Sequence, residues 1–119
     1  MEESYPPYGG SFKSDVFVLL YAQVDAIIYV IKALGFDDID VKVGETGWSS
    51  KGDDNELGAC LENAAIYNRN LLKRQMAKEG APLKPNLYVY IFALFNENKK
   101  SGPTSEIFVS GFDRVIFIE

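Results

Sequence analysis

Two glutamates, Glu45 and Glu97, stand just after apolar stretches of the chain and could supply acid, base or nucleophilic groups. Trp48 follows the first of them in a Gly-Glu-Thr-Gly-Trp run, and Gly44 and Gly47 allow the backbone to turn sharply there. An aromatic ring can cover the apolar face of a sugar while a neighbouring carboxylate reacts, so the run indicates a carbohydrate site. The other interpretation of each acid is a solvated loop residue, and the residues around one glutamate do not decide between the two.

Two predicted strands carry these acids. Apolar and polar residues alternate over about 39–43, which predicts a strand ending before Glu45. The run 87–95 is aromatic and β-branched without alternation, which is typical of a strand buried on both faces of a parallel sheet. Apolar residues recur at three- and four-residue steps over about 15–34 and 56–78, which predicts two helices. The order α-β-α-β contains a βαβ unit, so the sequence predicts an α/β fold with a parallel sheet.

The apolar helix faces and the polar residues beside them can also be assigned. The first helix is expected to bury Val16, Leu19, Leu20, Val24, Ile27, Ile28, Ile31 and Leu34, and the second Leu57, Cys60, Leu61, Ala64, Ala65, Leu71, Leu72 and Met76. Asn55 or Asp54 is expected to cap the second helix, and its Asn63, Asn68 and Asn70 are interpreted as solvated or capping residues rather than ligands. Residues 96–106 are predicted to form a loop, and 107–109 with 115–118 a hairpin.

The topology brings the two acids to one place. The carboxyl ends of parallel strands meet at one edge of a sheet, where α/β folds bind their ligands, so Glu45 and Glu97 are expected to share that edge. Lys100 and Glu106 can join them there; the alternative for each is a solvated loop charge. Carboxylates about 5 to 5.5 Å apart suit a retaining glycosidase and about 6.5 to 9.5 Å an inverting one, and a sequence does not give this distance.

Composition excludes several classes of function. A chain of 119 residues with 47% apolar content has the size of one domain with a core, and its net charge of -5 with dispersed Lys and Arg argues against nucleic acid. Histidine is absent, which removes the commonest general base and the commonest zinc ligand, so acid–base chemistry would have to come from carboxylates, lysines or tyrosines. We expect no metal and no cofactor. Cys60, the single cysteine, cannot form an internal disulfide. No apolar run reaches the ~18 to 20 residues of a membrane span, and residues 1–7 lack the layout of a secretory signal.

Several runs resemble the plant endo-1,3-β-glucanases, glycoside hydrolase family 17, in order and at family spacing. The matching runs are 44–50 with the family's (S/G/A)-E-(S/T)-G-W-P-S, 90–100 with Y-I-F-A-(L/M)-F-(N/D)-E-N-x-K, 62–71 with E-N-A-x-x-Y-N-x-N-L, 22–26 with A-Q-V-D-A and, more loosely, 5–8 with Y-P-(F/Y)-F. Gly102 to Glu106 resembles the continuation of the second of these runs. The resemblance covers about residues 20–106.

The resemblance implies a (β/α)8 barrel, of which this chain would hold roughly the last two strands with flanking helices, and retaining hydrolysis of 1,3-β-glucans. It assigns Glu45 as the nucleophile and Glu97, Lys100 and Glu106 as supporting charged residues of the cleft. It assigns Trp48, Phe95 and Tyr5 to substrate binding. It implies β-glucan as the partner, and its members are typically secreted to the cell wall or vacuole; the location of this chain stays open.

Departures from the family limit what we expect of the chain by itself. The family's proton donor lies in an N-E motif after the fourth barrel strand, which has no counterpart here, and a full barrel takes about 250 residues. Ser49 replaces the family proline, the lead-in is shortened, and 107–119 diverges as an altered reading frame or splice site would make it. We therefore divide the chain into an irregular lead-in (1–14), a barrel part (15–106) and a divergent tail (107–119), and expect little hydrolysis from it alone.

Two alternatives stay open beside an inactive glucanase part. One is a non-catalytic β-glucan binder that keeps the aromatic and charged residues of the site. The other is a barrel completed by association, either between two copies or with another chain, because the strand 87–95 of a partial barrel exposes unpaired edges and apolar faces.

Overall fold

A computed structural model describes residues 12–97 and 99–108 of the chain, with side chains from residue 19 onward. Its elements follow in the order α1 (Phe12–Ala33), β1 (Val43–Thr46), α2 (Leu61–Met76), β2 (Val89–Ile91) and α3 (Thr104–Ile107). The predicted order α-β-α-β is confirmed. The one-turn helix α3 lies where a loop was predicted and includes Ile107, so the predicted hairpin does not begin there; its remaining residues, 109–118, lie outside the described part.

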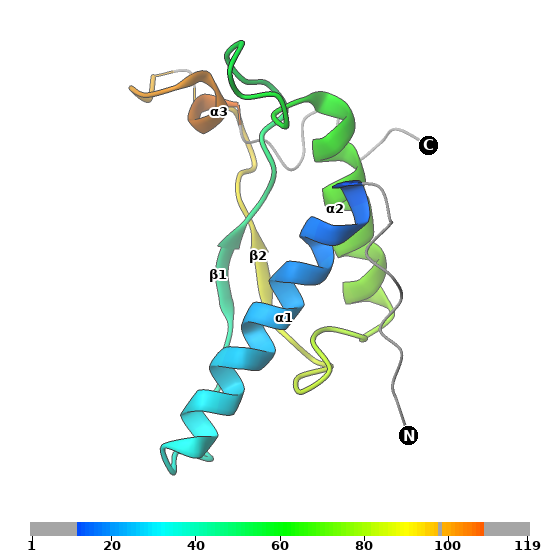
Figure 1. Cartoon of the computed structure of the whole chain (residues 1–119), viewed down its shortest axis with the longest axis vertical. Helices are drawn as coiled ribbons and strands as arrows, with labels where there is room; N and C mark the ends of the chain where they lie inside the picture. Colours follow the sequence, from blue (N-terminus) through cyan, green and yellow to red (C-terminus); the bar gives the residue numbers. More distant parts are fainter. Residues whose placement is uncertain (1–11, 98, 109–119) are drawn as a thin grey trace.

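The two strands pair in parallel, as expected of a βαβ unit, and α1 and α2 lie beside the pair (Figure 1). Val43 is opposite Val89 and Thr46 is opposite Ile91, with an irregularity in the register between them. The backbone amide of Phe92 donates to Thr46 O at 2.8 Å, where the pairing ends. Both strands are shorter than predicted, and β1 starts where the prediction ended, so Glu45 lies inside β1 instead of after it.

The core lies between the two helices and one face of the sheet. It consists of Tyr21, Val24, Ile28, Tyr67, Leu71, Ala81 and Leu87, with Leu20, Val41, Val43, Trp48, Val89 and Ile91 packed against it. Because all of these strand residues meet the helices from one side, the other face of the sheet has no cover among the described residues. Tyr88 and Tyr90 are 63% and 62% exposed, so the prediction that this strand is buried on both faces is wrong.

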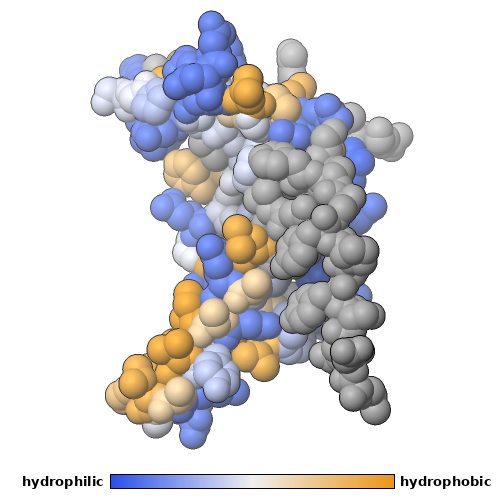
Figure 2. Space-filling view, in the orientation of Figure 1, coloured by the Kyte–Doolittle hydropathy of each residue, from blue (hydrophilic) through white to orange (hydrophobic). Residues whose placement is uncertain are grey.

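The helices also bury narrower faces than predicted. Leu19 and Ile27 of α1 are more than half exposed, as is Leu34 just after it. Among the described side chains of this helix, from residue 19 onward, Tyr21, Val24 and Ile28 are the buried ones, and Val16, also predicted to be buried, lies outside them. The helix meets α2 and the sheet along this one row, so the flanking apolar residues have no packing partner among residues 12–97 and 99–108. Figure 2 shows an apolar patch at the lower left, where the C-terminal end of α1 lies in Figure 1. In the second predicted helix, Leu57, Leu61 and Met76 are exposed in the same way.

The second helix begins later than predicted. Residues 53–59 form turns in which the amide of Glu56 donates to Asp53 O and that of Ala59 to Glu56 O, so neither Asp54 nor Asn55 caps a helix. Cys60 occupies the N-cap position of α2 and is half-buried, not the core residue predicted. Asn63 reaches back to this turn, with Nδ2 donating to Gly58 O at 2.9 Å, which connects the start of α2 to the turn before it.

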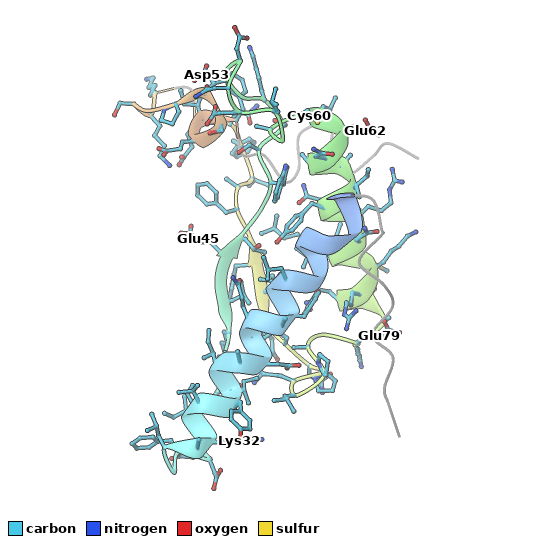
Figure 3. All side chains as sticks on the ribbon, in the orientation of Figure 1. Lys32, Glu45, Asp53, Cys60, Glu62 and Glu79 are labelled. Atoms are coloured by element: carbon cyan, nitrogen blue, oxygen red, sulfur yellow. The ribbon has the colours of Figure 1, made fainter. Side chains whose placement is uncertain are left out.

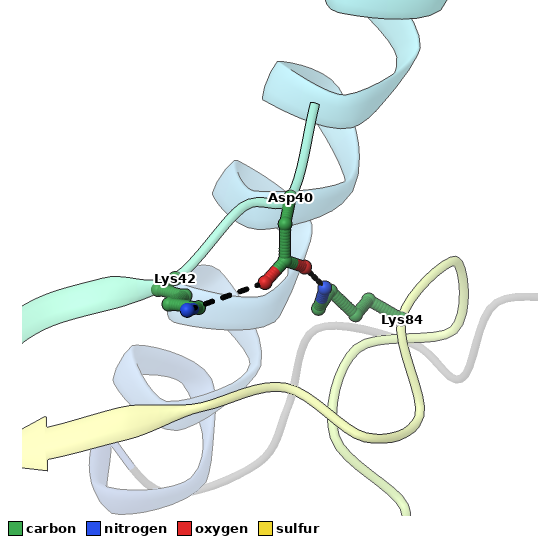
Figure 4. A network of polar contacts seen from close by, with 3 residues as sticks. All are labelled: Asp40, Lys42 and Lys84. Atoms are coloured by element: carbon green, nitrogen blue, oxygen red, sulfur yellow. Dashed lines mark ion pairs between the residues drawn. The ribbon is translucent and has the colours of Figure 1, made fainter. Parts of the chain in front are cut away.

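Polar contacts hold together the two segments that lead into the strands, the α1–β1 connection and the α2–β2 connection. Asp40, before β1, forms ion pairs with Lys42 and with Lys84 of the connection between α2 and β2 (Figure 4). Asp25 of α1 accepts a hydrogen bond from the amide of Leu83 at 2.9 Å. These contacts hold the α2–β2 connection against both α1 and the start of β1, which fixes where the two strands come side by side.

Candidate active site

A pocket of about 650 Å³ lies at the carboxyl ends of β1 and β2. Its lining residues are Glu45, Thr46, Gly47, Phe92, Glu97, Lys99 and Lys100. Glu45 projects from β1 on the side facing away from α2 (Figure 3). The pocket thus brings together three of the predicted site residues, Glu45, Glu97 and Lys100, at the sheet edge where ligands of α/β folds bind.

Lys100 connects the acid and aromatic groups on the β2 side of the pocket. Its Nζ lies 3.5 Å from Glu97 Oε2 and 5.6 Å from the centroid of the Phe92 ring, and its amide donates to Glu97 O at 2.9 Å. Both charged side chains are nearly half exposed, so the ion pair adds little to stability. The pair gives the pocket of Glu45 one hydrogen-bond acceptor for sugar hydroxyls, the Glu97 carboxylate, and one donor, the Lys100 ammonium group.

Trp48 lies on the other side of the strand end, against the helices. Its Nε1 donates to Gly58 O at 2.8 Å, and its ring centroid is 5.8 Å from that of Tyr67. It packs against both groups of core residues and also lines a second hollow, of about 440 Å³, that adjoins the first pocket at Gly47. Trp48 therefore anchors the turn after Glu45 to α2 as well as bordering the site.

Tyr67 of α2 supports the same strand end. Its hydroxyl and Thr46 Oγ1 lie 2.5 Å apart in a hydrogen bond, one residue after Glu45. Burial raises the pKa of Tyr67, so its hydroxyl stays protonated over the whole neutral range. Sequence reasoning did not select Tyr67, although it stands in one of the runs that resemble the family; nor did it select Phe92, which was counted as part of a buried strand.

The remaining predicted site residues lie elsewhere. Phe95 is 72% exposed and, like Glu106 on α3, lines neither of the two pockets described above. Tyr5 lies outside the described residues. Ser49, which stands in place of the family proline, donates a hydrogen bond from Oγ to Ser105 O of α3 at 2.6 Å.

Within residues 12–97 and 99–108, no group of three or more His, Cys, Asp or Glu residues could hold a metal ion. Across that part of the chain, no helix has the length and apolar character needed to cross a lipid bilayer.

Two carboxylates at the carboxyl edge of a parallel strand pair, with aromatic and lysine side chains in the same pocket, are compatible with a site of an α/β enzyme that hydrolyses sugars. The chain belongs to the glycosyl hydrolases family 17, whose sequence profile matches residues 10–109. It is 58% identical over 90 residues to "Glucan endo-1,3-beta-glucosidase 14" of Arabidopsis thaliana, covering 74% of this chain and 23% of that protein. To "Glucan endo-1,3-beta-D-glucosidase" of Olea europaea it is 46% identical over 87 residues, covering 71% and 19%.

Solved structures agree with the sequence relatives. CJP38, a β-1,3-glucanase and allergen of Cryptomeria japonica pollen, matches with a TM-score of 0.69 and 39% identity, over 77% of this chain and 28% of CJP38. A structure from a study of two plant β-glucan endohydrolases with distinct substrate specificities matches with a TM-score of 0.64 and 32% identity, over 76% of this chain and 28% of that one. The chain thus spans less than a third of the length of each of these relatives.

Proposed function

We propose that this chain carries the nucleophile side of a retaining 1,3-β-glucanase site, with Glu45 as nucleophile and Glu97, Lys100 and Glu106 as supporting charges. The observation that carries the proposal is the pocket in which Glu45, Glu97 and Lys100 meet, in a chain of this family. The two strands and their helices would be the last two βα units of a (β/α)8 barrel. Residues 15–106 would form this barrel part, between the lead-in 1–14 and the tail 107–119.

The proposed chemistry needs a second acid opposite the nucleophile. In a retaining mechanism Glu45 attacks the anomeric carbon while a proton donor protonates the leaving oxygen, and water then releases the sugar. The pocket supplies two acids, and we assign Glu97 to support because Lys100 holds its carboxylate. These 119 residues alone are therefore expected to hydrolyse natural 1,3-β-glucans poorly.

An activated donor tests Glu45 without requiring a proton donor. In a 2-deoxy-2-fluoro laminaribiosyl fluoride the anomeric C–F bond breaks without protonation and fluoride leaves, so attack by Glu45 forms an ester that accumulates. We expect an intact-mass increase of one fluorodisaccharide, mapped to the peptide holding Glu45. Glu45→Gln should abolish the labelling, and Glu79→Gln, at the distant end of α2 in Figure 3, should keep it.

Two outcomes would contradict parts of this proposal. Equal labelling of the Glu45→Gln variant would remove Glu45 as the nucleophile. Robust turnover of a soluble 1,3-β-glucan by the unmodified chain, abolished by Glu45→Gln, would show that the chain needs no further acid.

A non-catalytic glucan binder is the second candidate. The half-buried Trp48 in the hollow adjoining the pocket favours it, because a fixed aromatic ring can stack on a sugar whether or not the acid reacts. In calorimetry with laminarioligosaccharides, this candidate predicts binding that survives Glu45→Gln and is lost in Trp48→Ala. Absence of measurable heat with the unmodified chain would exclude it.

A further inference from the structure

The first turn of α3 is held by two carboxylates from a loop some fifty residues earlier. Thr104 donates from its amide to Asp53 Oδ2 at 3.2 Å and from its hydroxyl to Asp53 Oδ1. Ser105 donates from its amide to Glu56 Oε2 at 3.3 Å and from its hydroxyl to Glu56 Oε1. The amide of Asp53 also donates to Glu56 Oε2 at 2.8 Å, which fixes the two acids relative to each other. We call these four residues the acid clasp.

The clasp matters for α3 because this helix is one turn long. A helix of four residues does not form by itself, since nucleation is unfavourable and its first amides have no partner within the helix. Carboxylates at the N-terminal end satisfy those amides and complement the helix dipole with hydrogen bonds to charged acceptors, which are the stronger kind. Asp53 and Glu56 therefore stabilise the N-terminal end of α3.

The far end of α3 is bound to the candidate site. Ile107 O accepts a hydrogen bond from the amide of Glu97 at 3.0 Å. Phe108 O accepts from both the amide and the hydroxyl of Ser50, at 2.8 and 3.0 Å. The loop that follows Glu45 and the segment that holds Glu97 are thus joined through α3.

We propose that Asp53 and Glu56 are positioning residues, which hold α3 in place and so fix Glu97 relative to Glu45 across the pocket. This inference rests on the proposed function, because the distance between the two carboxylates determines how they can act on a glycosidic bond. Neither acid lines the pocket that contains Glu45, and Glu56 lines the adjoining hollow beside Trp48, so their connection to Glu45 and Glu97 runs through α3.

The clasp also gives the site a dependence on pH. Hydrogen bonds from Thr104 hold the pKa of Asp53 below its ordinary 3.8, and the bond from the Ser105 hydroxyl holds the pKa of Glu56 below its ordinary 4.5. Lys51 also attracts Asp53, whereas the charge of Asp53 opposes ionisation of Glu56. From α3, the hydroxyls and amides of Thr104 and Ser105 face the two acids. A lowered pKa in the folded state means stabilisation that is complete above these ordinary values and is lost as the pH falls through the folded values.

Amide hydrogen exchange followed by NMR tests the proposal on the whole chain. In Asp53→Ala/Glu56→Ala at neutral pH, the Glu97 amide should exchange at least about tenfold faster, since charged hydrogen bonds that hold its acceptor are lost. The Leu71 amide in α2 should not change. Asp54→Ala removes a charge from the same loop and should leave both amides unaffected. Affinity for laminaritriose should fall in the double variant and not in Asp54→Ala.

Low pH should break the contacts of the acid clasp without any mutation, so the proposal can be tested even if the double variant does not fold. In the unmodified chain, protection of the Glu97 amide, corrected for its intrinsic exchange rate, should fall as the pH drops through the acid range while that of Leu71 persists. Faster exchange of Thr104 and Ser105 with no change at Glu97, in either experiment, would overturn the proposal. Because exchange does not depend on glucan, failure of the proposed nucleophile leaves this result readable by itself.

Discussion

At the scale of single residues, Asn68 is the side chain that departs furthest from expectation. It was interpreted as solvated or capping, yet it is 1% exposed, and neither of its amide atoms has a hydrogen-bond partner among the described residues. A buried, unsatisfied amide loses its hydration without compensation, at a cost of about 1 to 3 kcal/mol. The sequence could not show this, because its helical position is also compatible with the solvent side until the packing partners of α2 are known.

Replacing this amide should therefore stabilise the fold. Asn68→Ala removes the unsatisfied atoms and gains helix propensity, against a small cavity, so we expect the free energy of unfolding to rise by about 1 kcal/mol. Asn70→Ala, on the same helix and half-buried, gains only the propensity and serves as the control. Urea unfolding followed by fluorescence of Trp48, the single tryptophan, measures both. The prediction would be contradicted if Asn68→Ala lowered the free energy of unfolding relative to Asn70→Ala.

The site residues show what residue patterns can and cannot supply. Glu45, Glu97 and Lys100 could be selected because charged residues near the carboxyl ends of parallel strands converge by topology. Phe92 could not, because its direction depends on where β2 ends, and the uniform apolar run gives no sign that the strand stops at Ile91. The roles of all these residues remain predictions.

At the scale of elements, the order was predictable and the boundaries were not. Helix periodicity and apolar runs are local properties, whereas a strand exists only where a partner runs beside it; residues 39–42 have the pattern of a strand but lie outside β1. In the loop 51–60, Asp54 and Asn55 were predicted to cap α2. The neighbouring acids Asp53 and Glu56 bind α3, and no local pattern reveals this contact because it joins residues about fifty positions apart.

Gly80, which follows α2, is the glycine that the α2–β2 connection requires. It has φ +23°, and an added Cβ would come within 2.4 Å of the carbonyl oxygens of Lys84 and Pro85. Gly35, after α1, has φ +87°, but an added Cβ there would have no described atom within 4 Å. Gly35→Ala should therefore cost about 1 to 2 kcal/mol from backbone conformation alone. Gly80→Ala should cost about 2 kcal/mol more, because backbone must move. Equal losses of stability for the two variants in thermal unfolding would contradict this prediction, because they would show that the α2–β2 connection adjusts to the added Cβ without cost.

At the scale of the whole molecule, two strands and their helices leave a sheet that is covered on one face. The run 87–95 has the composition of a strand buried on both sides, and in this chain it is not so buried. The composition of a segment reflects the surroundings in which that segment is stable. The relatives are more than three times as long as the matched region, so they have far more chain around the corresponding segment. The family and the α/β class could thus be predicted, whereas the burial of each residue could not.

The uncovered face leads to the prediction that this chain associates with itself. In the two-stranded sheet each strand has one side without a partner among the described residues, and Tyr88 and Tyr90 add exposed apolar area beside it. Unpaired strand edges next to apolar surface favour pairing between chains. Sedimentation velocity over rising protein concentrations should show growing dimers or larger species.

Two double variants locate the surface responsible. Tyr88→Lys/Tyr90→Lys should shift the chain toward monomer, since lysines at a strand edge oppose edge-to-edge pairing. Ile27→Lys/Leu34→Lys removes exposed apolar area from α1 and the turn that follows it, where no strand edge is open, and should have the smaller effect. A monomer at all concentrations would remove the prediction, and association lost only in the α1 variant would place the contact on the helix, leaving the sheet free for another partner.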